Sequence, residues 1–374
     1  MGEKVVSVFT NWFCWTQRPH HLVNYIGSVQ ARADVFSMKT ALSRGPALRD
    51  PHRLKASCLC PRPLTALSGV RRWNTIRKDR LLDSFFTSRA DCQIFAAAPQ
   101  TPTSTVRDCQ RIYDCMDDWS SFPGPTGEIG RHERRLCEWA DRIWVVSHKL
   151  KDLLAPKFKD RVEYVPNGVD YEHFQSVPDL RADLRSERPT LGYMGAIESW
   201  FDVKLVRDVA RILKDWSIVL VGPNRLSPED RAHLNLANIQ HGGRIAYSRL
   251  PALMATFDVA MIPFKINDLI KATSPIKLYE YLAAGLPVVA TPMPEVVPMS
   301  ENGVLSCCET AEGFAEAVRF LKSNARTARC QEIARNHTWR VRFEHPLARI
   351  LNPRPEGSPA AAEFRPQGVS AVSS

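Results

Sequence analysis

Residues 273–291 read TSPIKLYEYLAAGLPVVAT, and this stretch says most about the fold. Ser274 followed by Pro275 is typical of a helix start, Gly285 is typical of a helix end, and the apolar run after it is typical of a buried parallel strand. The order loop, helix, strand predicts one unit of a parallel α/β sheet. Such a helix directs free backbone N–H groups and a positive dipole end toward the edge of the sheet, where an anion is stabilised.

Lys277 and Glu280 are three residues apart on this helix, so their side chains share one face near its N-terminus. A lysine suits a phosphate, and a carboxylate suits the hydroxyls of a ribose or a sugar. The pair is therefore a candidate nucleotide-sugar site. A surface ion pair on a capped helix explains the same spacing, and the spacing alone leaves both interpretations open.

Short β-rich runs alternate with helix-periodic stretches on both sides of this unit, which predicts parallel α/β structure throughout. A turn-like stretch, PNGVD at 166–170, separates two such halves. We expect a first domain over 1–165 and a second over 166–335. We further expect a helix over 336–351 that crosses back to the first domain, and a disordered tail over 352–374, which is rich in Pro, Ala, Gly and Ser.

The composition predicts a cytoplasmic protein without a metal site. No apolar run approaches the roughly 20 residues of a membrane helix, and the chain enters a strand-like run at Val5 without a charged and apolar leader. The ten cysteines are scattered without paired CxxC spacing, so reduced thiols are expected.

The net charge of +10 is concentrated in the first half, where residues 44–89 hold eleven Arg or Lys against three Asp. Such a face suits anionic lipid headgroups or phosphate-bearing acceptors, so peripheral contact with an anionic membrane is one expectation. A solvated surface is the other. No RNP, zinc-finger or helix-turn-helix pattern is present, so nucleic acid is not an expected partner.

The pattern P-x-K-L-x-E-Y-x-A-x-G-x-P-V-V-A over 275–290 resembles the signature of family 4 glycosyltransferases, which belong to the glycosyl transferases group 1 and have the GT-B fold. The turn at 166–170, the strand ending at Gly195 and the run FDVAMIPF at 257–264 follow in the family's order. The first half resembles bacterial envelope polysaccharide and teichuronic-acid-type enzymes, through QRPHHL at 17–22 and YDCMDDW at 113–119.

This resemblance implies two Rossmann-like domains whose parallel sheets face each other across a cleft. It implies a hexosyltransferase that moves a sugar from a nucleotide-sugar donor to a glycan or lipid-linked acceptor in surface polysaccharide biosynthesis, with retention and without metal or cofactor. A UDP-sugar is the first expectation for the donor. The donor-binding residues implied are Gly195, Thr273, Ser274, Lys277 and Glu280.

In the first domain, Asp117 and Asp118 follow a strand where many family members carry a histidine that faces the sugar, so they are the candidate catalytic residues. The alternative is that one of them caps the following turn. Trp15, Gln17 and Arg18 are candidates for the acceptor side or the cleft, with ordinary packing as the alternative for the tryptophan.

Two other functions stay open, and one departure from the family bears on the second of them. The family's first motif glutamate would fall at position 272, which is Ala272 here. A nucleotide-sugar epimerase on the same fold, or a catalytically degenerate protein that binds a nucleotide sugar or a partner transferase, are the alternatives.

Overall fold

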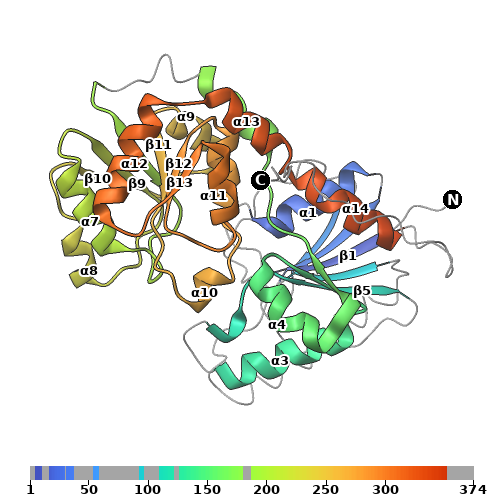
Figure 1. Cartoon of the computed structure of the whole chain (residues 1–374). Helices are drawn as coiled ribbons and strands as arrows, with labels where there is room; N and C mark the ends of the chain where they lie inside the picture. The colour runs from blue at the N-terminus through green and yellow to red at the C-terminus, as the bar shows by residue number, and fades with distance from the viewer. Residues whose placement is uncertain are drawn as a thin grey trace, which may run out of the picture.

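The computed structural model describes residues 5–10, 17–29, 31–37, 54–58, 92–96, 109–121, 126–179 and 187–351. These residues form two α/β units side by side (Figure 1). The predicted tail over 352–374, Trp15 and most of the basic stretch 44–89 lie outside the described residues.

The first unit is built on a parallel sheet of seven described strands in the order β3-β2-β1-β4-β5-β6-β7. The strands are β1 (Val5–Thr10), β2 (Arg32–Ser37), β3 (Leu54–Cys58), β4 (Cys92–Ala96), β5 (Gln110–Cys115), β6 (Arg142–Val145) and β7 (Val162–Tyr164). Helices α1 (Arg18–Ser28), α3 (Thr126–Trp139) and α4 (His148–Phe158) belong to this unit.

The second unit is built on a parallel sheet of six described strands in the order β10-β9-β8-β11-β12-β13. The strands are β8 (Thr190–Met194), β9 (Ser217–Val221), β10 (Ile239–Gly243), β11 (Val259–Ile262), β12 (Val288–Ala290) and β13 (Leu305–Cys307). Its helices are α5 (Tyr171–Phe174), α7 (Val203–Ile212), α8 (Pro228–His233), α9 (Leu250–Met254), α10 (Asp268–Lys271), α11 (Ile276–Ala283), α12 (Ala311–Ser323) and α13 (Thr327–Arg335).

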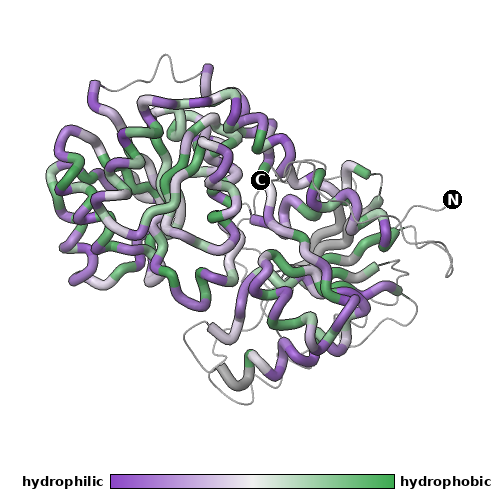
Figure 2. Tube along the Cα trace, viewed as in Figure 1, coloured by the Kyte–Doolittle hydropathy of each residue, from purple (hydrophilic) through white to green (hydrophobic). Residues whose placement is uncertain are grey.

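Both sheets reverse their strand order at one place, between β1 and β4 in the first and between β8 and β11 in the second. Open α/β sheets bind ligands beyond the carboxyl ends of the strands at such a switch point. The tube view shows apolar residues along the strands and hydrophilic ones on the outer helices (Figure 2). Burial of these apolar strands fixes the sheets and leaves their carboxyl edges to carry chemistry.

Within the described residues the chain crosses between the units twice, and the two crossings are hydrogen-bonded to each other. Val169 N–H donates to the His337 carbonyl at 3.0 Å, and Trp339 N–H donates to the Val169 carbonyl at 3.1 Å. The helix that follows, α14 (Trp339–Leu351), buries Phe343 and Leu347 in the apolar cluster of the first sheet. The end of the described chain therefore packs on the unit with which the chain begins (Figure 1).

Among the described residues, no helix combines the length and the apolar character that a bilayer crossing requires.

Candidate functional site

Three neighbouring strands of the second sheet end in glycine. Gly195 follows β8 and Gly222 follows β9, both with positive φ (141° and 142°), and Gly243 ends β10. The Gly195 N–H donates to the Val221 carbonyl at 2.8 Å, and a Cβ on Gly222 would lie 1.9 Å from the Gly195 oxygen. At Gly222 the neighbouring backbone leaves no room for a side chain, so this edge can present bare peptide groups to a ligand.

Lys277 of α11 crosses the end of β8. A Cβ on Gly195 would lie 3.0 Å from the Lys277 Cε, and the Lys277 Nζ lies 4.6 Å from the ring centre of Phe264 and 5.5 Å from that of Tyr193. Because Tyr193 belongs to β8 and Phe264 follows β11, the ammonium lies at the switch point of the sheet. Burial lowers its pKa to about 8, and the charge of Glu280 opposes that shift.

Glu280, one turn further along α11, is 8% exposed. Burial raises its carboxyl pKa to about 7; the Lys277 charge opposes this shift and the Asp170 charge adds to it. In the described part of the chain, neither Glu280 nor Lys277 has a hydrogen bond or a close ion pair from its side chain. The surface ion pair does not describe this geometry, because Glu280 is buried, Lys277 is half-buried, and neither is neutralised by contact with the other.

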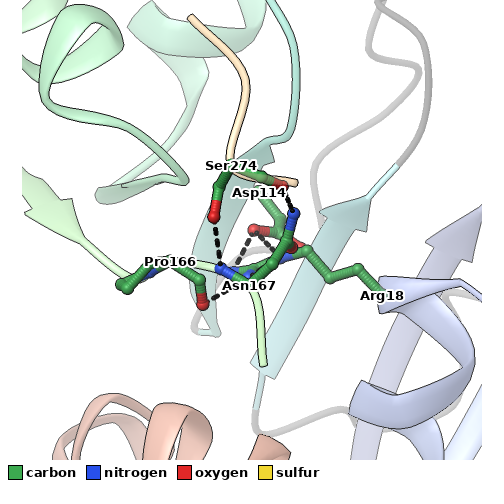
Figure 3. A network of polar contacts seen from close by, with 5 residues as sticks. All are labelled: Arg18, Asp114, Pro166, Asn167 and Ser274. Atoms are coloured by element: carbon green, nitrogen blue, oxygen red, sulfur yellow. Dashed lines mark hydrogen bonds and ion pairs between the residues drawn. The ribbon is translucent and has the colours of Figure 1, made fainter. Parts of the chain in front are cut away.

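Helix α11 begins one residue later than the sequence predicts. Pro275 occupies the N-cap position, and the predicted cap Ser274 accepts a hydrogen bond at its Oγ from the N–H of Asn167 (3.3 Å). The Ser274 carbonyl accepts from Asn167 Nδ2 at 2.7 Å (Figure 3). Ser274 is 2% exposed, so its hydroxyl satisfies a buried linker N–H and is not free for a donor.

The predicted end of this helix at Gly285 agrees with the structure. Gly285 has φ 71° at the C′ position, and the N–H groups of Gly285 and Leu286 donate to the carbonyls of Leu282 and Tyr281 in a Schellman motif. Thr273 is half-buried, and its hydroxyl donates to the Leu269 carbonyl at 2.8 Å.

Arg18, a candidate for the acceptor side or the cleft, is buried (2% exposed) in the first unit, so its guanidinium is not exposed to an acceptor. Its Nε lies 3.0 and 2.9 Å from the two carboxylate oxygens of Asp114, and its Nη1 donates to the Pro166 carbonyl at 3.2 Å (Figure 3). A buried guanidinium needs such a partner. Gln17 is exposed at the N-cap of α1, where it forms a capping box with His20.

Asp117 and Asp118, just beyond β5, differ in their contacts. Asp118 accepts hydrogen bonds from Ser120 N–H (3.1 Å), Ser120 Oγ (2.5 Å) and Ser121 Oγ (2.6 Å). Asp118 therefore caps the short 3-10 turn Trp119–Ser121, which is the alternative left open by the sequence. The half-buried Asp117 has no hydrogen bond to its carboxylate among the described residues, and burial together with the charge of Asp118 raises its pKa to about 7. Of the two, Asp117 is the candidate base.

The sequence did not single out Glu133 of α3, which lies next to this strand end. Its carboxylate accepts a hydrogen bond from Tyr113 Oη at 3.1 Å, and burial raises its pKa. A glutamate on an amphipathic helix carries no signal of such burial, because the pattern does not say which strand the helix covers.

Ala272 is fully buried and belongs to the apolar cluster of the first unit that contains Cys115 and Val146. The carboxyl ends of β5 and β6 therefore face the loop before α11. A glutamate at position 272 would bury its charge against this cluster, so the alanine fits the packing.

Glu295, also not predicted, bridges the two units beyond β12. Its Oε1 accepts from the His148 N–H at 2.6 Å, and its Oε2 accepts from Tyr164 Oη at 2.6 Å. His148 is the first residue of α4, so the carboxylate lies at the positive end of that helix. The carboxyl edges of the two sheets thus face each other.

Comparisons with known proteins agree with this arrangement. Residues 188–324 match the family model described as "Glycosyl transferases group 1". The chain is 31% identical over 217 residues to the Bacillus subtilis protein named "Putative teichuronic acid biosynthesis glycosyltransferase TuaH", a match that covers 54% of this chain and 55% of that protein. The chain thus spans about half the length of the curated relatives it matches.

Two solved structures resemble nearly the whole chain. Sucrose-phosphate synthase from Thermosynechococcus elongatus has a TM-score of 0.72 at 14% identity and covers 92% of this chain and 98% of its own. Anabaena HepE in complex with UDP and glucose has a TM-score of 0.68 at 15% identity and covers 93% and 99%. At such identity the likeness shows the fold, which is the GT-B fold expected from the sequence.

Proposed function

Because residues 188–324 are a glycosyl transferases group 1 domain within a GT-B fold, we propose that the protein is a glycosyltransferase that takes a sugar from a nucleotide-sugar donor bound on its second domain. The observation that carries this proposal is the pair Lys277 and Glu280. Glu280 is buried and Lys277 is half-buried at the switch point beside the glycine edge, and neither side chain has a hydrogen bond or a close ion pair among the described residues. An unpaired cation and an unpaired carboxylate suit a ligand that carries both phosphates and hydroxyls.

The leaving group of such a reaction is a nucleoside diphosphate. The ammonium of Lys277 and the N–H groups that begin α11 stabilise negative charge as the glycosidic bond breaks. Glu280 accepts hydrogen bonds from ribose hydroxyls. This division of roles needs no metal ion, so the proposal is a metal-independent reaction, and addition of EDTA is expected to leave turnover unchanged.

The finer parts of the proposal follow from the family resemblance and from what similar proteins are named for. We propose a family 4 hexosyltransferase that retains the anomeric configuration and acts in cell-envelope polysaccharide biosynthesis, as the name of the TuaH relative suggests. A UDP-sugar is the first donor to test, since HepE has been solved with UDP-glucose. We propose a glycan or lipid-linked acceptor and a cytoplasmic protein that contacts an anionic membrane peripherally.

Donor binding can be tested without knowing the acceptor. UDP-, GDP-, ADP- and dTDP-sugars are titrated by calorimetry and thermal shift into the wild type, Lys277→Ala and Glu280→Ala. Lys322→Ala is the matched control. Lys322 belongs to the outer helix α12, and its ammonium also lies over an aromatic ring, that of Trp216. Binding of one nucleotide class that is lost in both site variants and kept in the control supports the proposal.

Product analysis then separates the alternatives. A free epimer formed without acceptor would point to an epimerase. Retained binding without turnover across a broad acceptor panel would point to a degenerate binding protein, and absence of binding by the folded wild type would refute the donor site.

A further inference from the structure

The two segments that cross between the domains contact each other along their backbones. A Cβ on Gly168 would lie 2.8 Å from the His337 carbonyl oxygen, so the outgoing and returning segments touch at the backbone. Arg342 Nε from α14 donates to the Asn167 carbonyl at 3.1 Å, and two backbone hydrogen bonds join Val169 to the returning segment. Any rotation of one domain relative to the other pivots here, because only these two segments connect them covalently within the described chain.

Asn167 lies at this pivot with its amide group engaged on both sides. Its Oδ1 accepts from Arg18 Nη1 at 3.4 Å, and its Nδ2 donates to the Ser274 carbonyl at 2.7 Å (Figure 3). Its backbone N–H donates to Ser274 Oγ. The side chain is 8% exposed, so water does not readily replace these bonds.

The Asn167 amide thus forms a bridge between Arg18 and Ser274, and each of these two residues is close to a candidate functional group. Ser274 stands three residues before Lys277, with only Pro275 between it and the start of α11. On the other side, Arg18 holds Asp114 within β5, and Asp114 stands three residues before Asp117. The bridge therefore joins the loop that aims the donor helix to the strand that carries the candidate base.

We propose that Asn167 is a positioning residue that fixes the donor helix α11 relative to β5, and so aligns the donor with the acceptor-side carboxylate. This inference rests on the proposed function above. An asparagine suits the position because one amide must accept from a guanidinium and donate to a carbonyl. Aspartate has no donor for the Ser274 carbonyl, and alanine makes neither bond.

The test compares Asn167→Ala and Asn167→Asp with Asn238→Ala. Asn238 is a matched control, because its Nδ2 also donates to backbone carbonyls (Ala210 and Leu213, both 3.0 Å), but it lies at the opposite edge of the second sheet, before β10. Nucleotide Kd, kcat and acceptor KM are measured for each variant with the donor that the wild type binds.

Since the donor contacts themselves are untouched, Kd is expected to stay within about threefold of wild type while kcat falls about tenfold or more in both Asn167 variants. The control is expected to keep kcat within about twofold. Equal losses of kcat in Asn167→Ala and Asn238→Ala, or a loss of nucleotide affinity as large as the loss of kcat, would overturn the inference.

Small-angle scattering tests the bridge without turnover. Asn167→Ala is expected to increase the radius of gyration of the nucleotide-free protein, and Asn238→Ala is not. An unchanged profile in Asn167→Ala would also overturn the inference. If the wild type binds no donor, the proposed function fails, and scattering still decides whether Asn167 fixes the domains.

Discussion

Replacing Glu280 by glutamine should stabilise the free protein while weakening nucleotide binding. Burial raises the pKa of this carboxyl from 4.5 to about 7. Because the folded protein holds the proton more tightly than the unfolded chain, ionised Glu280 destabilises the fold. At about 1.4 kcal/mol per pKa unit, the full cost is at most about 3 kcal/mol. It is absent below pH 4.5, grows as the pH rises, and is complete once the pH has passed about 7.

The assay is urea unfolding of wild type and Glu280→Gln. At about pH 8 the glutamine protein should be more stable by up to about 3 kcal/mol, and near pH 5 the difference should shrink to below about 1 kcal/mol. Glu332→Gln is the control, since Glu332 is exposed on α13 and pairs only with Arg329 at 2.9 Å among the described residues.

The same variant should bind the nucleotide about tenfold more weakly at about pH 8, because an amide oxygen replaces a charged acceptor for ribose hydroxyls. Titration calorimetry measures this loss. A glutamine variant that is less stable than wild type at the higher pH, or a stability difference that does not change with pH, would show that Glu280 has a compensating partner in the free protein. Either result would refute the reasoning that places the donor there.

Three further substitutions test other parts of the site. Asp117→Asn should lower kcat by about 100-fold or more with unchanged nucleotide Kd, and wild-type turnover should rise as the pH passes through about 7, where this base loses its proton; a flat pH profile would contradict the assignment. Gly222→Ala, whose Cβ would lie 1.9 Å from the Gly195 oxygen, should lose about 3 kcal/mol or more in denaturation; a loss below about 1 kcal/mol would show that this edge can open. Glu295→Gln should cost about 1 kcal/mol in the same experiment, because the charge at the start of α4 is lost, and equal stability would mean that its bridge between the domains contributes little.

The donor helix shows what can be predicted from a local pattern. The helix that carries Lys277 and Glu280 and the strand after it follow from helix and strand periodicity, and the helix end follows from Gly285. In the structure the Lys277 side chain lies over Gly195. The predicted cap at Ser274 was wrong, because its hydroxyl accepts a hydrogen bond from the N–H of Asn167 in the linker and not from an N–H of the helix.

Arg18 and the neighbouring Asp117 and Asp118 show that local patterns do not predict the partners of a side chain. Whether Arg18 faces an acceptor or a buried Asp114, which lies 96 residues away in the chain, depends on the strand order of the first sheet. Asp118 caps its own turn, and burial together with the charge of Asp118 raises the pKa of Asp117.

The sequence by itself determined the two α/β halves, the parallel sheets and the helix that carries the candidate donor site, since these depend on periodicity and on turn residues close together in the chain. Only the tertiary structure decided which polar groups are partnered. Asn167, Ser274, Arg18 and Asp114 come together from four separate segments at the crossing between the domains. The physical reason is that burial, which sets both hydrogen-bond demand and pKa, is a property of how the sheets and domains pack against each other and not of any one segment.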